Sequence, residues 1–144
     1  MSLPKMSTLQ VLKAARERIT NIRNWTTNIR WSSTLDAAGK FPQNCALGAI
    51  EFAYGFRDWA HMYDQIDLGK PVAALAAAAR ELSPELKGVS YNTSIVATLN
   101  NTMGHNRTLA MFDLAIATEK DRIRKRRMKK VEAETESDKE YALA

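Results

Sequence analysis

The sequence lacks the residues on which several classes of protein depend. It contains one cysteine, Cys45, which excludes an internal disulfide and a zinc site built from cysteines. With only two histidines, a metal site would need several carboxylate ligands as well, and no complete set is evident. The glycine-rich and histidine- or serine-containing signatures of the best-known nucleotide-binding proteins and hydrolases are also missing. The sequence therefore predicts no metal site and no cofactor.

Long apolar runs are missing as well. The longest, Val72–Ala79, is too short to span a bilayer, and the first residues are charged and patterned rather than typical of a signal peptide. A chain of 144 residues can bury a substantial core and fits one compact domain. These features predict a cytoplasmic protein that does not associate with membranes.

The net charge of +5 conceals an uneven distribution. Residues 120–130 hold eight Lys or Arg and one Asp, a net charge of +7, whereas residues 131–144 hold five acidic residues and one Lys, a net charge of −4. Residues 1–119 are nearly neutral. We therefore expect a helical domain over residues 1–119 and a charged extension over residues 120–144, which is basic over 120–130 and acidic over 131–144.

Apolar residues recur at helical spacing in most of the chain. This pattern predicts an all-α fold, a single compact bundle of four to five helices with an extended basic C-terminal helix. A long ordered loop, held to the core by its large aromatic side chains, follows the first helix. The expected helices are about Thr8–Arg23, Asn44–Asp64, Pro71–Leu82, a short helix from Tyr91, and a last helix that begins at Asn106 or Thr108; the aromatic residues of the loop are Trp25, Trp31 and Phe41. The β-branched residues after Tyr91 would equally suit a short strand, but we favour the helix because no second strand is evident to pair with it.

Two glycines interrupt the second expected helix. Gly48 and Gly55 each cost about 1 kcal/mol relative to alanine inside a helix. We interpret them as marks of close helix contacts or of a break near Gly55.

The polar segment TLNNTMGHNRT, residues 98–108, is a candidate contact site. Asn106 is expected to cap the last helix, and Gly104 is expected to take a positive φ after the preceding helix. Capping does not explain His105 or Arg107, and Arg107 beside free helix N–H groups could hold a phosphate or a partner's carboxylate. The segment is thus either a helix connector or a ligand or partner contact, with Asn100 and Asn101 as further candidates.

Cys45 lies in the first turn of the second expected helix, where a lowered thiol pKa would favour nucleophilic chemistry. One hypothesis is therefore a small enzyme or nucleotide-binding protein in which four residues converge on one pocket: Cys45, Asn100, His105 and Arg107. The alternative is that Cys45 is simply a small buried apolar residue. We assign no catalytic residue.

The basic segment is the strongest local signal. On a helix its like charges repel one another, so it gains from an anionic partner, which could be nucleic acid, an acidic protein surface or the acidic tail. It lacks interleaved aromatic residues, so binding to nucleic acid would be directed at the backbone and sensitive to salt. The alternative is a soluble extension screened by the acids that follow. The candidate contacts are Lys120, Arg122, Arg124, Lys125, Arg126, Arg127, Lys129 and Lys130.

Three short segments, VLKAARERI, CALGAI and NN…RTLAMFDLAI, together resemble an uncharacterised family of small bacterial and phage proteins. That family has Cys-x-x-Gly-Ala on a central helix and, near its C-terminus, an Asn…Arg-Thr helix motif. The residues that match are Cys45, Gly48, Ala49, Asn100, Arg107 and Thr108. Leu99 and Asn101 depart from the pattern, which tends to have Trp and Asp there, and the loss of that Asp counts against an acid–base or metal role. The resemblance implies no known activity.

The leading expectation is a small non-enzymatic binding or regulatory protein of phage or prophage type. It would act through protein or anionic-ligand contacts at Asn100–Thr108 and Lys120–Lys130, with an unidentified protein as its partner. Nucleic-acid binding through the basic helix is the first alternative, and the small enzyme or nucleotide-binding protein is the second.

Overall fold

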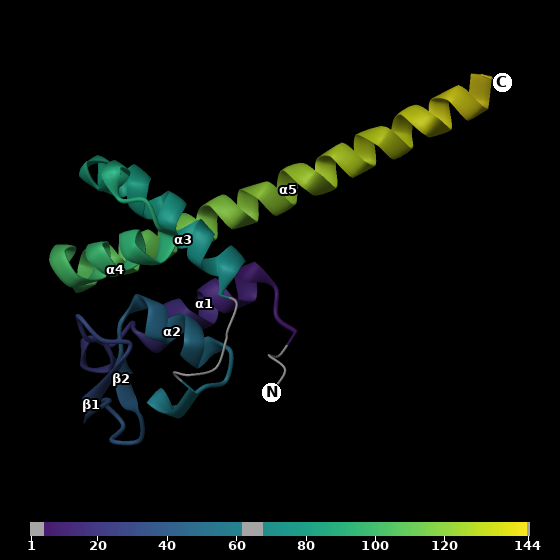
Figure 1. Cartoon of the computed structure of the whole chain (residues 1–144). Coiled ribbons are helices and arrows are strands. Elements are labelled where there is room, and N and C mark those ends of the chain that lie inside the picture. Colours follow the sequence, from purple (N-terminus) through teal and green to yellow (C-terminus); the bar gives the residue numbers. More distant parts are fainter. Residues whose placement is uncertain (1–4, 62–67, 144) are drawn as a thin grey trace.

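A computed structural model of the chain describes residues 5–61 and 68–143. Four helices and the first part of a fifth pack together, and the rest of the fifth projects away as a straight rod (Figure 1). The helices are α1 (Thr8–Arg18), α2 (Ala46–Ala53), α3 (Gly69–Leu82), α4 (Asn92–Met103) and α5 (His105–Leu143), with short 3-10 helices η1 (Ile22–Asn24), η2 (Trp59–His61) and η3 (Pro84–Gly88) and strands β1 (Trp31–Leu35) and β2 (Pro42–Asn44).

One core joins all five helices. α2 lies at its centre, because every residue from Ala46 to Glu51 is buried, as its apolar circumference predicts. Each of the five helices contributes large side chains that are fully buried, among them Leu12, Ile50, Leu75, Leu99 and Phe112. The all-α class and the compact bundle are therefore confirmed. No helix in the described part of the chain is long and apolar enough to cross a membrane.

The long loop expected after α1 is ordered, but it contains a small β-hairpin that the sequence analysis did not predict. β1 and β2 form a two-stranded antiparallel sheet in which Trp31 lies opposite Asn44 and Leu35 lies opposite Pro42. Trp31 is buried, and Trp25 and Phe41 are partly buried, so the large aromatic side chains do hold this segment to the core.

α1 ends at Arg18, five residues before the expected end at Arg23. Two side chains contact the backbone carbonyl groups of Arg18 and Ile19, which would accept intrahelical hydrogen bonds in a longer helix. The Asn24 side-chain amide donates to the Arg18 carbonyl, and His105 Nε2 lies 2.6 Å from the Ile19 carbonyl oxygen. Ile22 lies within the expected helix, but it is 60% exposed because α1 has already ended.

α2 ends at Ala53 and not near Asp64. Gly55 has a φ of 107°, a left-handed conformation that breaks the helix as one of the two interpretations predicted. Residues 62–64 of the expected helix lie outside the described residues. Gly48 marks a close contact, but with the hairpin segment and not with another helix: a Cβ there would overlap the Arg30 carbonyl oxygen and crowd the Asn44 side-chain amide.

The remaining helices lie close to their expected positions. α3 ends at Leu82, and the segment after Tyr91 forms α4, as expected. Gly104 has a φ of 88° and turns the chain directly into α5, which begins at His105. Asn106 was expected to be the N-cap but lies inside the first turn. The Gly104 carbonyl accepts hydrogen bonds from both the Thr108 N–H and its hydroxyl, so the helix starts one residue earlier.

Candidate functional site

Asn100 is the best-connected residue of the polar segment and is completely buried. Its side-chain oxygen accepts hydrogen bonds from Trp25 Nε1 at 2.8 Å and from the Ala46 N–H at 2.9 Å. Its amide nitrogen donates to the Thr26 carbonyl and to the Asn101 side chain, both at 3.1 Å. The side chain of Asn100 is therefore fully used inside the protein.

Ala46 is the first residue of α2, and the N-cap residue Cys45 makes no side-chain capping bond. Asn100 therefore caps α2 from another helix, which satisfies one of the free N–H groups at the helix N-terminus. The N-terminus of α2 thus points at a neutral amide that is already hydrogen-bonded, and not at an open anion site.

Cys45 is 4% exposed, and burial raises the pKa of its thiol, although the backbone N–H groups of Gly48 and Leu47 act in the opposite direction. A thiol with a raised pKa stays protonated at neutral pH, whereas nucleophilic catalysis needs the thiolate. The buried position therefore favours the interpretation of Cys45 as a small apolar core residue.

Asn101 and His105 are also occupied by structural contacts. The Asn101 side-chain oxygen accepts a hydrogen bond from the backbone N–H of Asn28, which has a φ of 67° and so needs such support. His105 Nε2 contacts the carbonyl of Ile19, the C-cap residue of α1, and its ring centroid lies 5.2 Å from that of Trp25. Because a carbonyl can only accept, Nε2 carries the proton in this contact.

Of the four residues expected to converge, Asn100 and His105 both contact Trp25. Asn101, a further candidate contact, bonds to Asn100. Cys45 is the residue before Ala46, whose backbone N–H donates to Asn100. Arg107 is exposed and takes part in none of these contacts. The polar segment is therefore a junction that ties α1, the start of α2, and the Trp25–Asn28 turn to α4 and α5.

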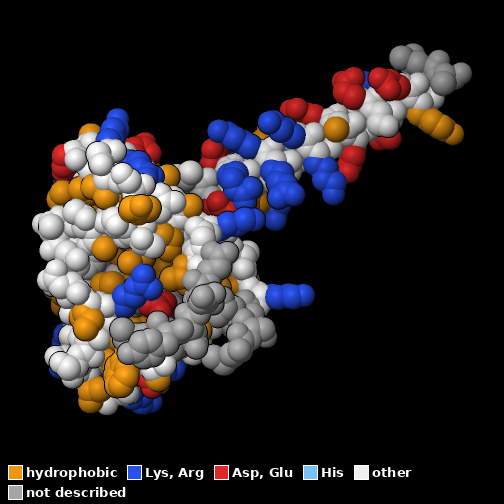
Figure 2. Space-filling view, viewed as in Figure 1, with side chains coloured by type: hydrophobic (Ala, Val, Ile, Leu, Met, Phe, Trp, Pro, Cys, Tyr) orange, Lys and Arg blue, Asp and Glu red, His pale blue; other side chains and the backbone are white. Residues whose placement is uncertain are grey.

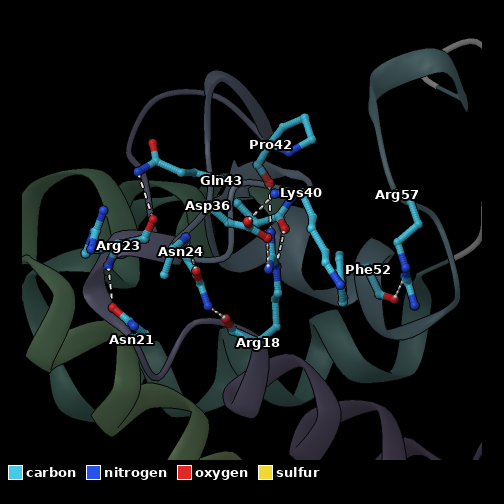
Figure 3. Close-up of polar contacts among 12 residues, drawn as sticks. Arg18, Asn21, Arg23, Asn24, Asp36, Lys40, Pro42, Gln43, Phe52 and Arg57 are labelled. Carbon is cyan, nitrogen blue, oxygen red and sulfur yellow. Dashed lines mark hydrogen bonds and ion pairs between the residues drawn. The ribbon is translucent and has the colours of Figure 1, made fainter.

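A second polar cluster, centred on Arg18, was not predicted. Arg18 leaves the end of α1 and reaches into the hairpin (Figure 3). Its guanidinium donates to Asn44 at 2.9 Å, to Asp36 at 2.8 Å and to the Pro42 carbonyl at 2.8 Å. The Arg18 and Asp36 side chains are only 7% and 3% exposed. The only signal in the sequence for this cluster is that Arg18 lies within the first expected helix, beside the apolar Ile19.

Asp36 is held as a carboxylate. Burial raises its pKa, but hydrogen bonds from the Lys40 N–H, the Arg18 side chain and the Phe41 N–H outweigh that effect, so the pKa lies below its usual value. This buried pair, with its hydrogen bonds, fixes the hairpin against α1.

An open pocket of about 390 Å³ lies beside this cluster. The Arg18 and Arg57 guanidinium carbons lie 4.1 and 3.8 Å from the centroid of the Phe52 ring, which lines the pocket. Arg57 Nη1 donates to the Phe52 and Phe56 carbonyls, so it closes the C-terminal end of α2 (Figure 3). Both arginines are engaged with protein groups, and Glu17 adds a negative charge to the lining.

The basic residues of the sequence analysis lie on the projecting part of α5. Every residue from Arg124 to Tyr141 is exposed. Figure 2 shows basic side chains on the half nearer the packed helices and acidic side chains toward the C-terminus. Arg122 pairs with Glu119, and both Arg124 and Lys125 pair with Asp121. Within the described residues, no ion pair involves Arg126, Arg127, Lys129 or Lys130.

Fold and site together define a small helical protein with a hairpin between its first two helices and a long exposed C-terminal helix. The chain belongs to DUF6197, a family of unknown function, whose sequence profile matches residues 4–118. This agrees with the expectation of an uncharacterised family. The match ends at residue 118, so the projecting part of α5 lies outside it. Neither the curated proteins nor the solved structures contain a significant match.

Proposed function

We propose that this protein is a non-enzymatic binding protein that contacts another macromolecule through the arm, defined as residues 120–143 of α5. The other described residues, 5–61 and 68–119, form the body, which holds the arm in place. The observation that carries this proposal is the continuous exposure of the arm from Arg124 to Tyr141.

The polar residues of the body support the same proposal by their contacts. Asn100, Asn101 and His105 bind Trp25, Ala46, Asn28 and Ile19, all within the fold. The Cys45 thiol is buried, with a raised pKa. These residues stabilise the body, which leaves the charged arm as the surface best suited to a partner.

We propose the bacterial or phage origin and the cytoplasmic location from the sequence. The motif residues in CALGAI and NN…RTLAMFDLAI support a bacterial or phage origin, and the single buried cysteine fits a reducing compartment such as the cytoplasm.

Photo-crosslinking in bacterial cells tests the arm as the contact surface. A photoreactive benzoylphenylalanine at Val131, which is 60% exposed on the arm, should give covalent adducts. The same group at Tyr91, which is 74% exposed on the body, serves as the matched control and should give few. Adducts at Tyr91 with none at Val131 would show that the body carries the contact surface instead.

Nucleic acid is the second candidate partner, because eight cations in residues 120–130 surround the helix. The segment would contact only the phosphates of the nucleic acid, since it has no aromatic residue on which a base could stack. Fluorescence anisotropy with a labelled DNA duplex should then show an affinity that falls steeply with salt, with a slope of about 0.9 per phosphate neutralised. Replacement of Arg126, Arg127, Lys129 and Lys130 by Gln should reduce that slope. Binding that is insensitive to salt would contradict this candidate.

A further inference from the structure

The basic and acidic segments of the arm cannot pair with each other within one chain. α5 is one continuous helix from His105 to Leu143, so the acidic residues 132–140 cannot fold back onto the basic residues 120–130 of the same chain. With a rise of 1.5 Å per residue, the arm is about 36 Å long. An exposed helix that is polar on every side needs many side-chain pairs or a partner to be stable, and the second half of the basic segment has no ion pair in the described part of the chain.

One line, or stripe, of exposed residues along the arm indicates which charges a partner must carry. Arg124, Val131 and Asp138 are spaced by seven residues, so they lie almost in line along the helix. All three are exposed, and Val131 is 60% exposed. The stripe therefore reads basic, apolar and acidic from the body outward.

We propose that the arm pairs with the arm of a second copy of this chain in antiparallel orientation, with Val131 near the two-fold axis. This inference rests on the proposed function and names its partner. The antiparallel arrangement brings Arg124 of each copy opposite Asp138 of the other and the two Val131 side chains together. A parallel pair would place like charges opposite one another along the whole arm.

The same axis pairs the charges beside the stripe. Arg127 and Glu134 lie on the same side of the helix as the stripe, so the axis at Val131 brings Arg127 of each copy beside Glu134 of the other. Such an interface is isologous, so it closes as a dimer and does not extend into a filament. The antiparallel arrangement places the two bodies at opposite ends of the paired arms.

The apolar contribution is small, so charge dominates the interface. Met128 and Val131 are 50% and 60% exposed, and Tyr141 is 86% exposed near the end of the arm. Few apolar side chains thus become buried, and screening by salt should weaken the dimer markedly.

Charge exchange between two variants tests the pairing by sedimentation equilibrium of the full chain. One variant carries Arg124→Glu and Arg127→Glu, and the other carries Glu134→Lys and Asp138→Lys. We expect the wild-type chain to dimerise at low salt, each variant alone to dissociate at least tenfold more readily, and their mixture to form a heterodimer. A control with Lys13→Glu and Lys87→Glu makes the same change of net charge as the first variant, but on the exposed surface of the body, and should still dimerise.

Disulfide trapping tests the orientation. A chain with Arg124→Cys mixed with a chain with Asp138→Cys should form a mixed disulfide under mild oxidation, while neither chain alone should form one. Disulfides of each variant with itself would show a parallel pair and overturn the proposal. The native Cys45 is buried and does not interfere.

The outcomes separate this inference from the proposed function. A wild-type chain that stays monomeric at low salt overturns the antiparallel dimer. If Val131 then still gives adducts with other molecules, or the arm binds duplex DNA, the arm remains the contact surface. If Val131 gives no adduct of any kind, the proposed function fails with it.

Discussion

Asn100 illustrates, at the scale of single residues, how a motif that suggests a binding site can serve the fold. Its amide bonds to Trp25, Ala46, Thr26 and Asn101, so each of its polar atoms serves two partners. The same residue belongs to the Asn…Arg-Thr motif, and Gly48 belongs to the Cys-x-x-Gly-Ala motif, where the Arg30 carbonyl leaves no room for a side chain. Both residues thus have structural reasons for their identity.

Replacement of Asn100 by Ala should lower the free energy of unfolding by about 2–4 kcal/mol, because the buried Ala46 N–H and the partly buried Trp25 Nε1 lose their acceptor. Urea denaturation followed by circular dichroism measures this. Asn106→Ala is the control, since Asn106 is exposed, and its effect should stay within about 0.5 kcal/mol. Equal effects of the two substitutions would contradict the structural role of Asn100.

Replacement of Gly48 by Ala should destabilise the protein by about 1–3 kcal/mol, because the new methyl group overlaps the Arg30 carbonyl and the backbone must move. Gly88→Ala introduces the same methyl group where no atom lies within 4 Å, and it should be nearly neutral. Thermal unfolding of the two variants provides the comparison, and a neutral Gly48→Ala would rule out the close approach.

At the scale of secondary-structure elements, the helices were predictable and the hairpin was not. α3, α4 and α5 follow local periodicity and punctuation by glycine and proline, so their positions could be read from the chain. The hairpin depends on Arg18 and Asn44, whose contacts join residues that are far apart in sequence. The early end of α1 depends likewise on His105, which no local pattern connects to Ile19.

The candidate site was likewise only partly predictable from the sequence. The sequence drew attention to the polar segment, because three asparagines, a histidine and an arginine in eleven residues are unusual for a connector. It could not show that Asn100 caps α2, since that contact spans 54 residues. The arm was predictable from composition alone, because charge and helix propensity are local properties.

Asp36→Asn should reduce stability at neutral pH and weaken the loss of stability in acid. The pKa of Asp36 is lowered in the folded protein, so its carboxylate stabilises the fold above the unfolded value of about 3.9, and this stabilisation disappears as the pH falls through the lower folded pKa. Unfolding free energies of both proteins between about pH 2 and 7 should therefore converge at the acid end.

The exposed pair of Asp113 with Arg16 is the matched control for that experiment. Asp113 is 59% exposed, so screening by water should keep the effect of Asp113→Asn small at every pH. If Asp36→Asn behaved like Asp113→Asn, the buried pair would not hold the hairpin as we describe.

At the scale of the whole molecule, the buried core and the continuously exposed charged helix lie in different parts of the chain. The body contains the core, the polar junction around Asn100 and the Arg18 cluster, and it coincides with the region that matches the family. The arm adds charge but no buried residue from Arg124 to Tyr141. Changes in the arm should therefore alter binding without altering the stability of the body.

The most direct test of that separation uses a full chain with Arg126→Gln, Arg127→Gln, Lys129→Gln and Lys130→Gln and the photoreactive group at Val131. We predict that its adducts in cells fall at least tenfold below those of the chain with a native basic segment, while thermal unfolding of the body is unchanged. Adducts at an undiminished level, or a large fall in the unfolding temperature, would contradict the account.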